Sequence, residues 1–248
     1  MSPPLDLDRL RRTVALACRI MGHAGLAQDI LGHVSVRVDD ATMLVRCRGP
    51  EERGLLFTVD DDIKVVDFDG RVEAADGWAP PSELPIHAEV LRARADVDAV
   101  VHCHPPSVLV AGIAGIELRP LFGAYNIPAT RLALDGIPTY PRAVLVRRAE
   151  LGRELVAAMG SAPACVLRGH GIVTVGSGPH AIEQAMVRAL NLEVLAAVNL
   201  QVQRVAPGAA AIPPQDVAEL PDLGSAFNDL LVWNHHVARL RHAGLALD

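Results

Sequence analysis

The sequence predicts a single α/β domain whose strands are short and mostly antiparallel. The chain has 248 residues and no linker-like segment divides it, which favours one domain over residues 1–248. Hydrophobic residues make up 50% of the chain, and no charge run is long enough to indicate disorder. Segments with helical periodicity alternate with short β-like runs, so helices and strands are both expected throughout.

The first quarter of the chain is expected to form one helix and then a set of strands. Apolar residues recur every three or four positions from Leu7 to Met21, and Gly22 follows them. This pattern predicts an amphipathic helix with a glycine stop. Four short runs of antiparallel strand character come next: HVSVRV, TMLVRC, LLFTV and IKVVDF.

A second helix is expected in PPSELPIHAEVLRAR, with Ser82 as its N-cap and Glu83 in its first turn. Its buried stripe is predicted to contain Leu84, Ala88, Leu91 and Ala95. DVDAVVHCH reads as a strand that follows this helix. Residues 115–141 are rich in Gly and Pro, so loops with at most one helix are expected there.

The last third is predicted to be mostly helical. AELGRELVAAMG forms a helix that stops at Gly160, and ACVLRGHG and IVTVG form strands around a turn. A long helix is expected over residues 180–204, and a closing helix in GSAFNDLLVWNHHVARLRHAG. The Ala/Pro/Gly stretch between them, residues 206–214, is interpreted as a local connection.

The composition favours a cytoplasmic protein with a small-molecule partner. A net charge of −6 and 3% aromatic residues argue against a nucleic-acid surface. The longest apolar stretches are shorter than the roughly 20 residues of a membrane span, and no signal-peptide pattern begins the chain. The four cysteines are widely spaced without a CxxC motif, so free thiols are expected.

Two histidines in DAVVHCHPPS are one residue apart. Side chains alternate along a strand, so His102 and His104 point to one side while Cys103 points to the other. The two prolines then end the strand. The pair is compatible with a metal site at the strand end or with two partly buried structural histidines.

A catalytic metal typically has three protein ligands and an open position. Most other histidines (His23, His180, His235, His236 and His242) lie where a solvated or capping role fits. His170 differs because Gly169 and Gly171 enclose it, which indicates a tight turn or a closely approaching ligand. Glu83 could be a carboxylate that stabilises a helix start, or a general acid/base beside a metal.

Taken in order, GHVSVR, SELPIHAEVLRARADVDAVVHCHPPSVLVAG and CVLRGHGIVTVG resemble the class II aldolase/adducin family over about residues 7–204. The resemblance implies His102, His104 and His170 as metal ligands and Glu83 as the catalytic acid/base. It also implies a single-domain sandwich with a central, largely antiparallel sheet flanked by helices, and a homotetramer. Three imidazoles accept Zn, Mn, Co or Fe.

The chain departs from the sugar-phosphate aldolases of that family where they hold phosphate. His33 replaces an asparagine, Pro81 precedes Ser82 in place of two serines, and RCRGPEERG replaces a serine-glycine loop. GHVS and RGP look similar to the dihydroxyphthalate decarboxylase branch. Three arginines lie in this region: Arg46, Arg48 and Arg53. Together with Ser82 they could bind a planar carboxylate of the substrate. Alternatively, they are charged side chains on a solvent-exposed strand face.

The favoured function is that of a metal-dependent carbon–carbon lyase on a non-phosphorylated acid. A dihydroxyphthalate decarboxylase of aromatic-compound catabolism is the specific expectation. The first alternative is an aldolase or epimerase acting on a sugar phosphate or hydroxy-keto acid, and the second is a non-catalytic adducin-like scaffold. Candidates for the proton donor, beyond Glu83, are Tyr125, His33, His87, His235 and His236.

Overall fold

The computed structural model describes residues 5–73 and 77–247, and the strands in this part form one mixed, open sheet. The single-domain prediction over residues 1–248 stays a prediction, and residues 1–4, 74–76 and 248 lie outside the described part. The strands are β1 (His33–Arg37), β2 (Thr42–Arg46), β3 (Ile63–Asp67), β4 (Ala99–Cys103), β5 (Thr139–Tyr140), β6 (Ala164–Leu167) and β7 (Gly171–Gly176).

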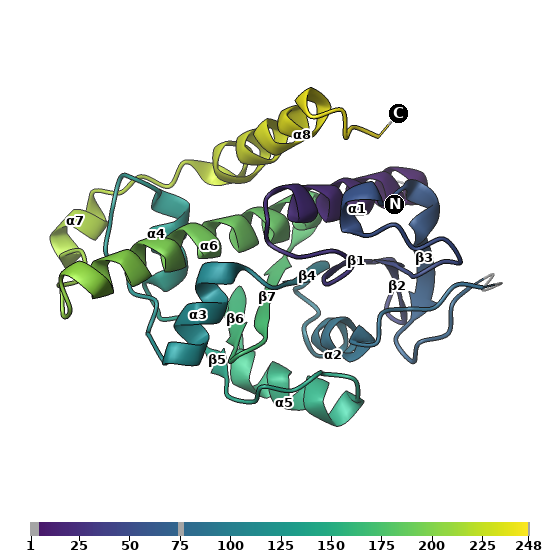
Figure 1. Ribbon diagram of the computed structural model, residues 1–248, viewed down its shortest axis with the longest axis horizontal. Helices are drawn as coiled ribbons and strands as arrows, with labels where there is room; N and C mark the ends of the chain where they lie inside the picture. Colours follow the sequence, from purple (N-terminus) through teal and green to yellow (C-terminus); the bar gives the residue numbers. More distant parts are fainter. Residues whose placement is uncertain (1–4, 74–76, 248) are drawn as a thin grey trace.

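Helices connect and cover these strands (Figure 1). The α-helices are α1 (Leu7–His23), α2 (Leu84–Ala93), α3 (Pro106–Ala114), α4 (Ile127–Ala133), α5 (Ala149–Met159), α6 (Ala181–Val205), α7 (Pro214–Ala218) and α8 (Val232–His242). Short 3₁₀ turns lie at Leu55–Phe57, Asp60–Asp62 and Gly178–His180, and a π-helical turn at Ala226–Leu231 leads into α8.

The sheet has the strand order β3-β2-β1-β4-β7-β6-β5 within the described residues. Every neighbouring pair is antiparallel except β5 with β6, so the predicted largely antiparallel sheet is confirmed. The register pairs His33 of β1 with His102 of β4, and Cys103 of β4 with Ile172 of β7. The central strand β4 therefore ends between the start of β1 and the start of β7.

Each face of the sheet has its own hydrophobic core. Val101 and Cys103 pack with α1, α3 and α6 on one face, whereas Val100 packs with α2 and α5 on the other. Figure 1 shows these two layers, with α1 and α6 on one side of the strands and α2 and α5 on the opposite side. Because side chains alternate along β4, His102 belongs to the face that α2 covers.

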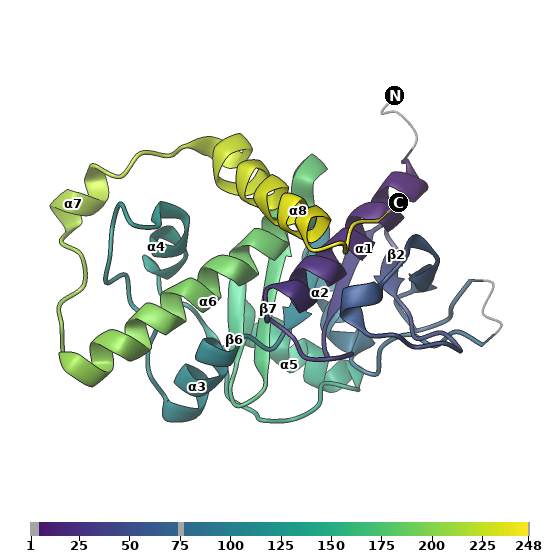
Figure 2. The same cartoon turned by 45° about the horizontal axis from the view of Figure 1, so that its top comes forward.

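The C-terminal segment packs on the outside of the first layer. Figure 2 shows α8 crossing over α6 and α1, and the Arg19 guanidinium of α1 donates hydrogen bonds to the carbonyls of Leu245 and Ala246. By length and composition residues 178–205 could cross a membrane. However, α6 packs against β4 and β7, and half of its most apolar window is buried inside the protein, as in a core helix.

Two local predictions were wrong. LLFTV forms the 3₁₀ turn Leu55–Phe57 rather than a strand, because Gly54 has a φ of 84° and the Thr58 hydroxyl bonds back to the Leu55 carbonyl. The N-cap of α2 is Glu83 rather than Ser82, and Ala95 lies beyond the helix and is exposed. Hydrophobic periodicity contains neither the glycine turn before Leu55 nor the hydrogen bond by which the Ser82 hydroxyl accepts from Arg48.

The four cysteines are free and buried, as expected: Cys18, Cys47, Cys103 and Cys165. Burial raises the pKa of Cys18 and of Cys47 to about 12. These side chains therefore remain neutral thiols at physiological pH and act as small core residues.

The end of α2 depends on Arg37 of β1. The Arg37 guanidinium donates to the carbonyls of Leu91, Arg94 and Val97, at distances of 2.6, 3.1 and 3.0 Å from Nη2. We expect Arg37→Met to lower the free energy of unfolding by about 2 kcal/mol, because these carbonyls would lose charged donors. Urea unfolding measures this change, and Arg9→Met on the exposed face of α1 is the control. Equal stability of the two variants would contradict the assigned role.

Candidate functional site

Four of the side chains singled out from the sequence meet at one end of the sheet. His102 is the residue before the last in strand β4, and His104 lies just beyond its end. His170 lies in the turn between β6 and β7, next to β4 because Cys103 pairs with Ile172. Glu83 is the N-cap of α2, the helix that covers this face of the sheet.

The four residues surround one point. Each offers one nitrogen or oxygen atom, and these atoms all lie within 4.8 Å of one another: Glu83, His102, His104 and His170. The Glu83 Oε2 atom is 3.4 Å from His102 Nε2 and also 3.4 Å from His170 Nε2. The ring centroids of His102 and His104 are 4.8 Å apart, and those of His104 and His170 are 5.2 Å apart. Such a cluster has the ligand types of a divalent transition-metal site.

Hydrogen bonding determines which nitrogen of His102 faces the cluster. His102 Nδ1 lies 2.9 Å from the Ile172 carbonyl, an acceptor, so Nδ1 must carry the proton when the ring is neutral. The lone pair is then on Nε2, which is buried and lacks a hydrogen-bond partner within the described residues. It faces the Glu83 carboxylate, another acceptor, and a cation between them would satisfy both groups. This is the tautomer and outer contact of a metal-binding histidine.

The His104 imidazole is also suited to bind a metal. Burial, with the neighbouring His102 and His170, lowers the pKa of His104 to about 3. The ring is therefore neutral at physiological pH, and its buried Nε2 has no hydrogen-bond partner in the described part of the chain. A neutral imidazole with a free lone pair is the form that binds metal ions.

The Glu83 carboxylate is ionised and held from one side. Its Oε1 atom accepts a hydrogen bond from the Val146 N–H at 2.9 Å, which leaves Oε2 toward the histidines. Burial acts to raise the pKa of Glu83, but N–H donors and positive charge at the His102 and His170 rings, where a bound cation would lie, outweigh it and hold this pKa well below its usual range. The carboxylate can therefore bind a cation or accept a proton.

Glycines let the strands approach closely enough for the cluster to form. A Cβ atom on Gly171 would lie 2.3 Å from the Cys103 carbonyl oxygen and 2.6 Å from a His104 ring carbon. Gly169 has a φ of 64°, a conformation that other residues rarely adopt. The glycines around His170 thus have the role that the sequence suggested, a tight turn and a close approach.

Three further groups extend the cluster beneath α2, of which Ser35 and His87 are buried and His33 is partly buried. The His33 ring stacks on His102 with centroids 5.4 Å apart, and it meets His87 edge-on at 5.6 Å. His87 Nδ1 is 2.7 Å from the Ser35 hydroxyl. Burial and the nearby imidazoles hold the pKa of His33 well below its usual range and lower that of His87 to about 3. Both rings are therefore neutral neighbours of the cluster.

The three candidate arginines occupy different environments. Arg46 is buried, donates to the Thr58 hydroxyl at 2.9 Å and forms an ion pair with Glu52. Its positive charge is therefore compensated inside the protein. Arg48 is exposed and donates to the Ser82 hydroxyl at 2.9 Å, next in the chain to Glu83. Arg53 is exposed and its side chain makes no ion pair with the described residues. Of the three, Arg48 is hydrogen-bonded to the residue that precedes the N-cap of α2.

The remaining proton-donor candidates are not brought to the cluster within this chain. Tyr125 is 73% exposed and packs edge-on against Phe122. His235 and His236 lie on α8, on the outer layer. Their predicted roles stay predictions, because the fold of a single chain places them elsewhere.

Sequence reasoning missed the contacts that orient the cluster. The Val146 N–H and the Ile172 carbonyl are backbone groups, so residue type carries no signal for them. Ser35 could have been found, because alternation along HVSVR places it on the same face as His33.

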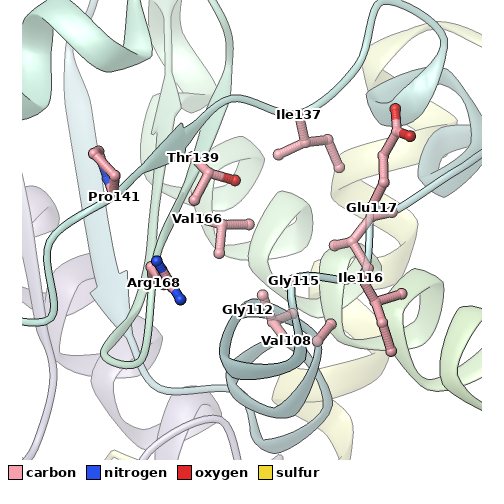
Figure 3. A pocket seen from close by; sticks show the side chains of 12 residues that line it. Val108, Gly112, Gly115, Ile116, Glu117, Ile137, Thr139, Pro141, Val166 and Arg168 are labelled. Carbon is pink, nitrogen blue, oxygen red and sulfur yellow. The ribbon is translucent and has the colours of Figure 1, made fainter.

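A cavity of about 510 Å³ lies between α3 and the β5–β6 edge of the sheet. Figure 3 shows Thr139 and Arg168 on one side of it and Ile116 and Glu117 on the other, with Gly112 of α3 below. None of the four cluster residues lines this cavity. It is therefore distinct from the cluster, although Arg168 is only two residues from His170.

Comparisons with known proteins agree with this geometry. A family model described as the class II aldolase and adducin N-terminal domain matches residues 12–200. A 3,4-dihydroxyphthalate decarboxylase from Arthrobacter keyseri is 47% identical over 244 residues, 97% of each chain. An L-fuculose phosphate aldolase from Escherichia coli strain K12 is 26% identical over 214 residues, 86% of this chain and 93% of that one.

The fold has relatives among solved structures. An aldolase II superfamily protein from Pseudomonas syringae superposes with a TM-score of 0.81 at 20% identity, and the match covers 99% of this chain and 96% of the other. At this identity the likeness shows the shared fold, an open mixed sheet flanked by helices.

Proposed function

The chain belongs to the class II aldolase and adducin family, and we propose that it is a metal-dependent decarboxylase of a dihydroxylated aromatic acid such as a dihydroxyphthalate. The observation that carries the reaction class is the cluster of one carboxylate and three imidazoles around a single point. The substrate class rests on the relative of that activity, 47% identical along nearly the whole chain.

In this proposal His102, His104 and His170 hold the metal, and Glu83 lies beside it. A bound divalent cation would stabilise the negative charge that develops on the substrate oxygens when the carbon–carbon bond breaks. Zn, Mn, Co and Fe all suit three imidazoles. The Ile172 carbonyl and the Val146 N–H keep His102 and Glu83 in place.

Glu83 is proposed to move the proton. Its ionised Oε2 atom can accept the proton of a ring hydroxyl as the substrate binds and return it to the ring carbon that loses CO₂. This transfer balances, because the carboxylate leaves as CO₂, the electrons of the broken bond stay on the ring, and the returned proton forms the new C–H bond. His33, stacked on His102 and neutral, remains a second candidate for a proton relay beside Glu83.

Arg48 and Ser82 are proposed to bind a carboxylate of the substrate, with Arg53 as a further cation of the same loop. Their hydrogen bond places the Arg48 guanidinium beside the residue that precedes Glu83. Arg46 is proposed only to hold this loop in place, because its charge is paired with Glu52 inside the protein. A planar guanidinium can bind a carboxylate with two parallel hydrogen bonds.

Arg48→Lys is expected to raise KM for the aromatic acid by about tenfold, because a lysine ammonium cannot reproduce the two-pronged contact. Steady-state kinetics of CO₂ release measures the effect. Arg71→Lys, which changes an exposed arginine in the turn after β3, serves as the control. Unchanged KM in Arg48→Lys would remove Arg48 from the substrate site.

Two wider inferences accompany the activity. We infer a homotetramer from membership of the family, and the apolar side chains Val110 and Ile113 on α3, 52% and 62% exposed, offer surface for a subunit contact. We also infer a cytoplasmic enzyme with a small-molecule substrate and no nucleic-acid or membrane partner, supported by four free buried thiols and a net charge of −6.

A reaction screen tests the proposed function. The purified protein is reconstituted separately with Mn, Co, Fe and Zn and incubated with dihydroxylated phthalates, dihydroxylated benzoates and a panel of sugar phosphates. We expect CO₂ release from a dihydroxyphthalate. Aldehyde release from a sugar phosphate without CO₂ from any aromatic acid would favour the aldolase alternative. A protein that retains no metal after reconstitution would favour a scaffold.

A further inference from the structure

The loop of residues 47–54, between β2 and the 3₁₀ turn Leu55–Phe57, carries Arg48 and is held from inside the protein by Thr58. Thr58 is fully buried and directly follows the turn. Its hydroxyl donates to the Leu55 carbonyl at 2.9 Å and accepts a hydrogen bond from Arg46 Nε at 2.9 Å. One hydroxyl therefore joins the end of β2, where the loop begins, to the turn where the loop ends.

Arg46 also binds the middle of the loop. Its guanidinium forms an ion pair with Glu52, and Glu52 Oε1 accepts the Gly54 N–H at 2.7 Å. Gly54 has a φ of 84°, and a Cβ atom there would lie 3.0 Å from the Asp29 carbonyl oxygen. The bend at Gly54 is thus stabilised by a carboxylate that Arg46 keeps in place.

A second buried guanidinium binds the backbone of Thr58. Arg19 Nε of α1 donates to the Thr58 carbonyl at 2.6 Å, and Arg19 Nη1 donates to the carbonyls of Leu245 and Ala246 at 2.8 and 3.1 Å. Burying a charged group is costly unless its hydrogen bonds are made, so two guanidinium groups that share one threonine have few alternative arrangements. Thr58 therefore has a fixed position between α1, the C-terminal segment and the loop.

The outer side of the loop reaches the start of α2. The Arg48 backbone pairs with Ala79, and Arg48 Nη2 donates to the Ser82 hydroxyl at 2.9 Å. Arg48 is exposed and lies two residues after Arg46. Its side chain makes few contacts of its own, so the place of its guanidinium depends on the loop backbone that Arg46 and Thr58 hold.

We propose that Thr58 is a positioning residue for substrate binding, which acts through Arg46 and Glu52 to present the Arg48 guanidinium to a carboxylate of the aromatic acid. This inference rests on the proposed function of Arg48. The network shares no hydrogen bond with the four residues of the metal cluster in the described part of the chain. Loss of the Thr58 hydroxyl should therefore weaken substrate binding and spare the metal and the chemical step.

Thr58→Val keeps the size of the side chain and removes its hydroxyl. In the CO₂-release assay we expect KM for the dihydroxyphthalate to rise by about fivefold, with kcat changed by less than about twofold and metal content unchanged, because a small displacement of a positioning group weakens binding. Thr58→Ser retains the hydroxyl and should retain the wild-type KM.

Thr174→Val is the matched control. Thr174 is also fully buried, and its hydroxyl donates to the Ala185 carbonyl at 2.7 Å, but it lies in β7, away from the loop. The substitution should cost a similar amount of stability and leave KM unchanged. An equal rise of KM in Thr58→Val and Thr174→Val would overturn the proposal, because it would show a general effect of lost stability.

A double variant tests whether Thr58 acts through Arg48. In the Arg48→Lys background, in which KM is expected to be about tenfold raised, Thr58→Val should raise KM by less than about twofold more. Independent effects would instead multiply to about fiftyfold. A product of the two single effects would overturn the positioning role.

Amide hydrogen exchange tests the network without the reaction. The Gly54 N–H, which donates to Glu52, should exchange about tenfold faster in Thr58→Val than in the wild type or in Thr174→Val. Unchanged exchange would overturn the proposal, and so would faster exchange with an unchanged KM. An unchanged KM in Arg48→Lys would mark a failure of the proposed carboxylate contact itself, and the positioning role would fall with it even if Gly54 exchanged faster.

Discussion

Replacing His102 by alanine is expected to abolish metal binding and to lower turnover by about 10³-fold or more. The variant loses one of three imidazoles that meet within 4.8 Å, and the two that remain form a weak site. Loss of the cation would remove several kcal/mol of charge stabilisation from the transition state, and each 1.4 kcal/mol is about tenfold in rate. Elemental analysis after reconstitution and CO₂ release measure the two effects on the same sample.

The controls for this prediction come from the same chain. His102 is fully buried and bonds to the Ile172 carbonyl, so its variant also loses packing. His104→Ala removes a more accessible ligand and should show the same joint loss, which distinguishes a metal effect from unfolding. His242→Ala changes an exposed imidazole at the end of α8 and should keep both metal and turnover. Full activity of His102→Ala or His104→Ala would contradict the assignment of these residues as metal ligands.

The proximity of these residues was predictable because two simple rules apply to them. Strand alternation places His102 and His104 on one side, and the glycines beside His170 indicate a close approach. The structure shows both features, with a Cβ at Gly171 excluded by the Cys103 carbonyl. Glu83 was assigned to the cluster by the order of the motifs and the resemblance to a family. Its position at the start of a helix did not by itself distinguish it from an ordinary capping residue.

What the sequence did not reveal depends on partners far along the chain. Alternation put Arg46 and Arg48 on one face but could not show that Arg46 forms an ion pair with Glu52 and donates to the Thr58 hydroxyl. The apolar run after His104 forms α3 because its first N–H groups bond to Glu193, 86 residues away. A short apolar run fits strand or helix equally well until such a contact decides. Tyr125 is likewise placed by the loop before α4, where periodicity is absent.

Glu83→Gln should lower turnover by about 10²-fold or more while the metal stays bound. The amide has nearly the same shape and can still accept the Val146 N–H, so α2 and the cluster keep their positions. The three imidazoles remain as ligands, but an amide cannot accept and return a proton. Metal content by elemental analysis and single-turnover CO₂ release separate binding from chemistry.

The alternative role for Glu83 is that of a fourth metal ligand, which its 3.4 Å distances to two imidazole nitrogens permit. Glu83→Ala distinguishes the two roles, because a proton carrier can be removed without loss of metal whereas a ligand cannot. Glu89→Gln changes another buried carboxylate of α2, paired with Arg92, and controls for charge loss in this helix. If Glu83→Gln turned over at a near-normal rate with metal bound, the carboxylate would serve only to accept the Val146 N–H, and His33 would become the first candidate for the proton.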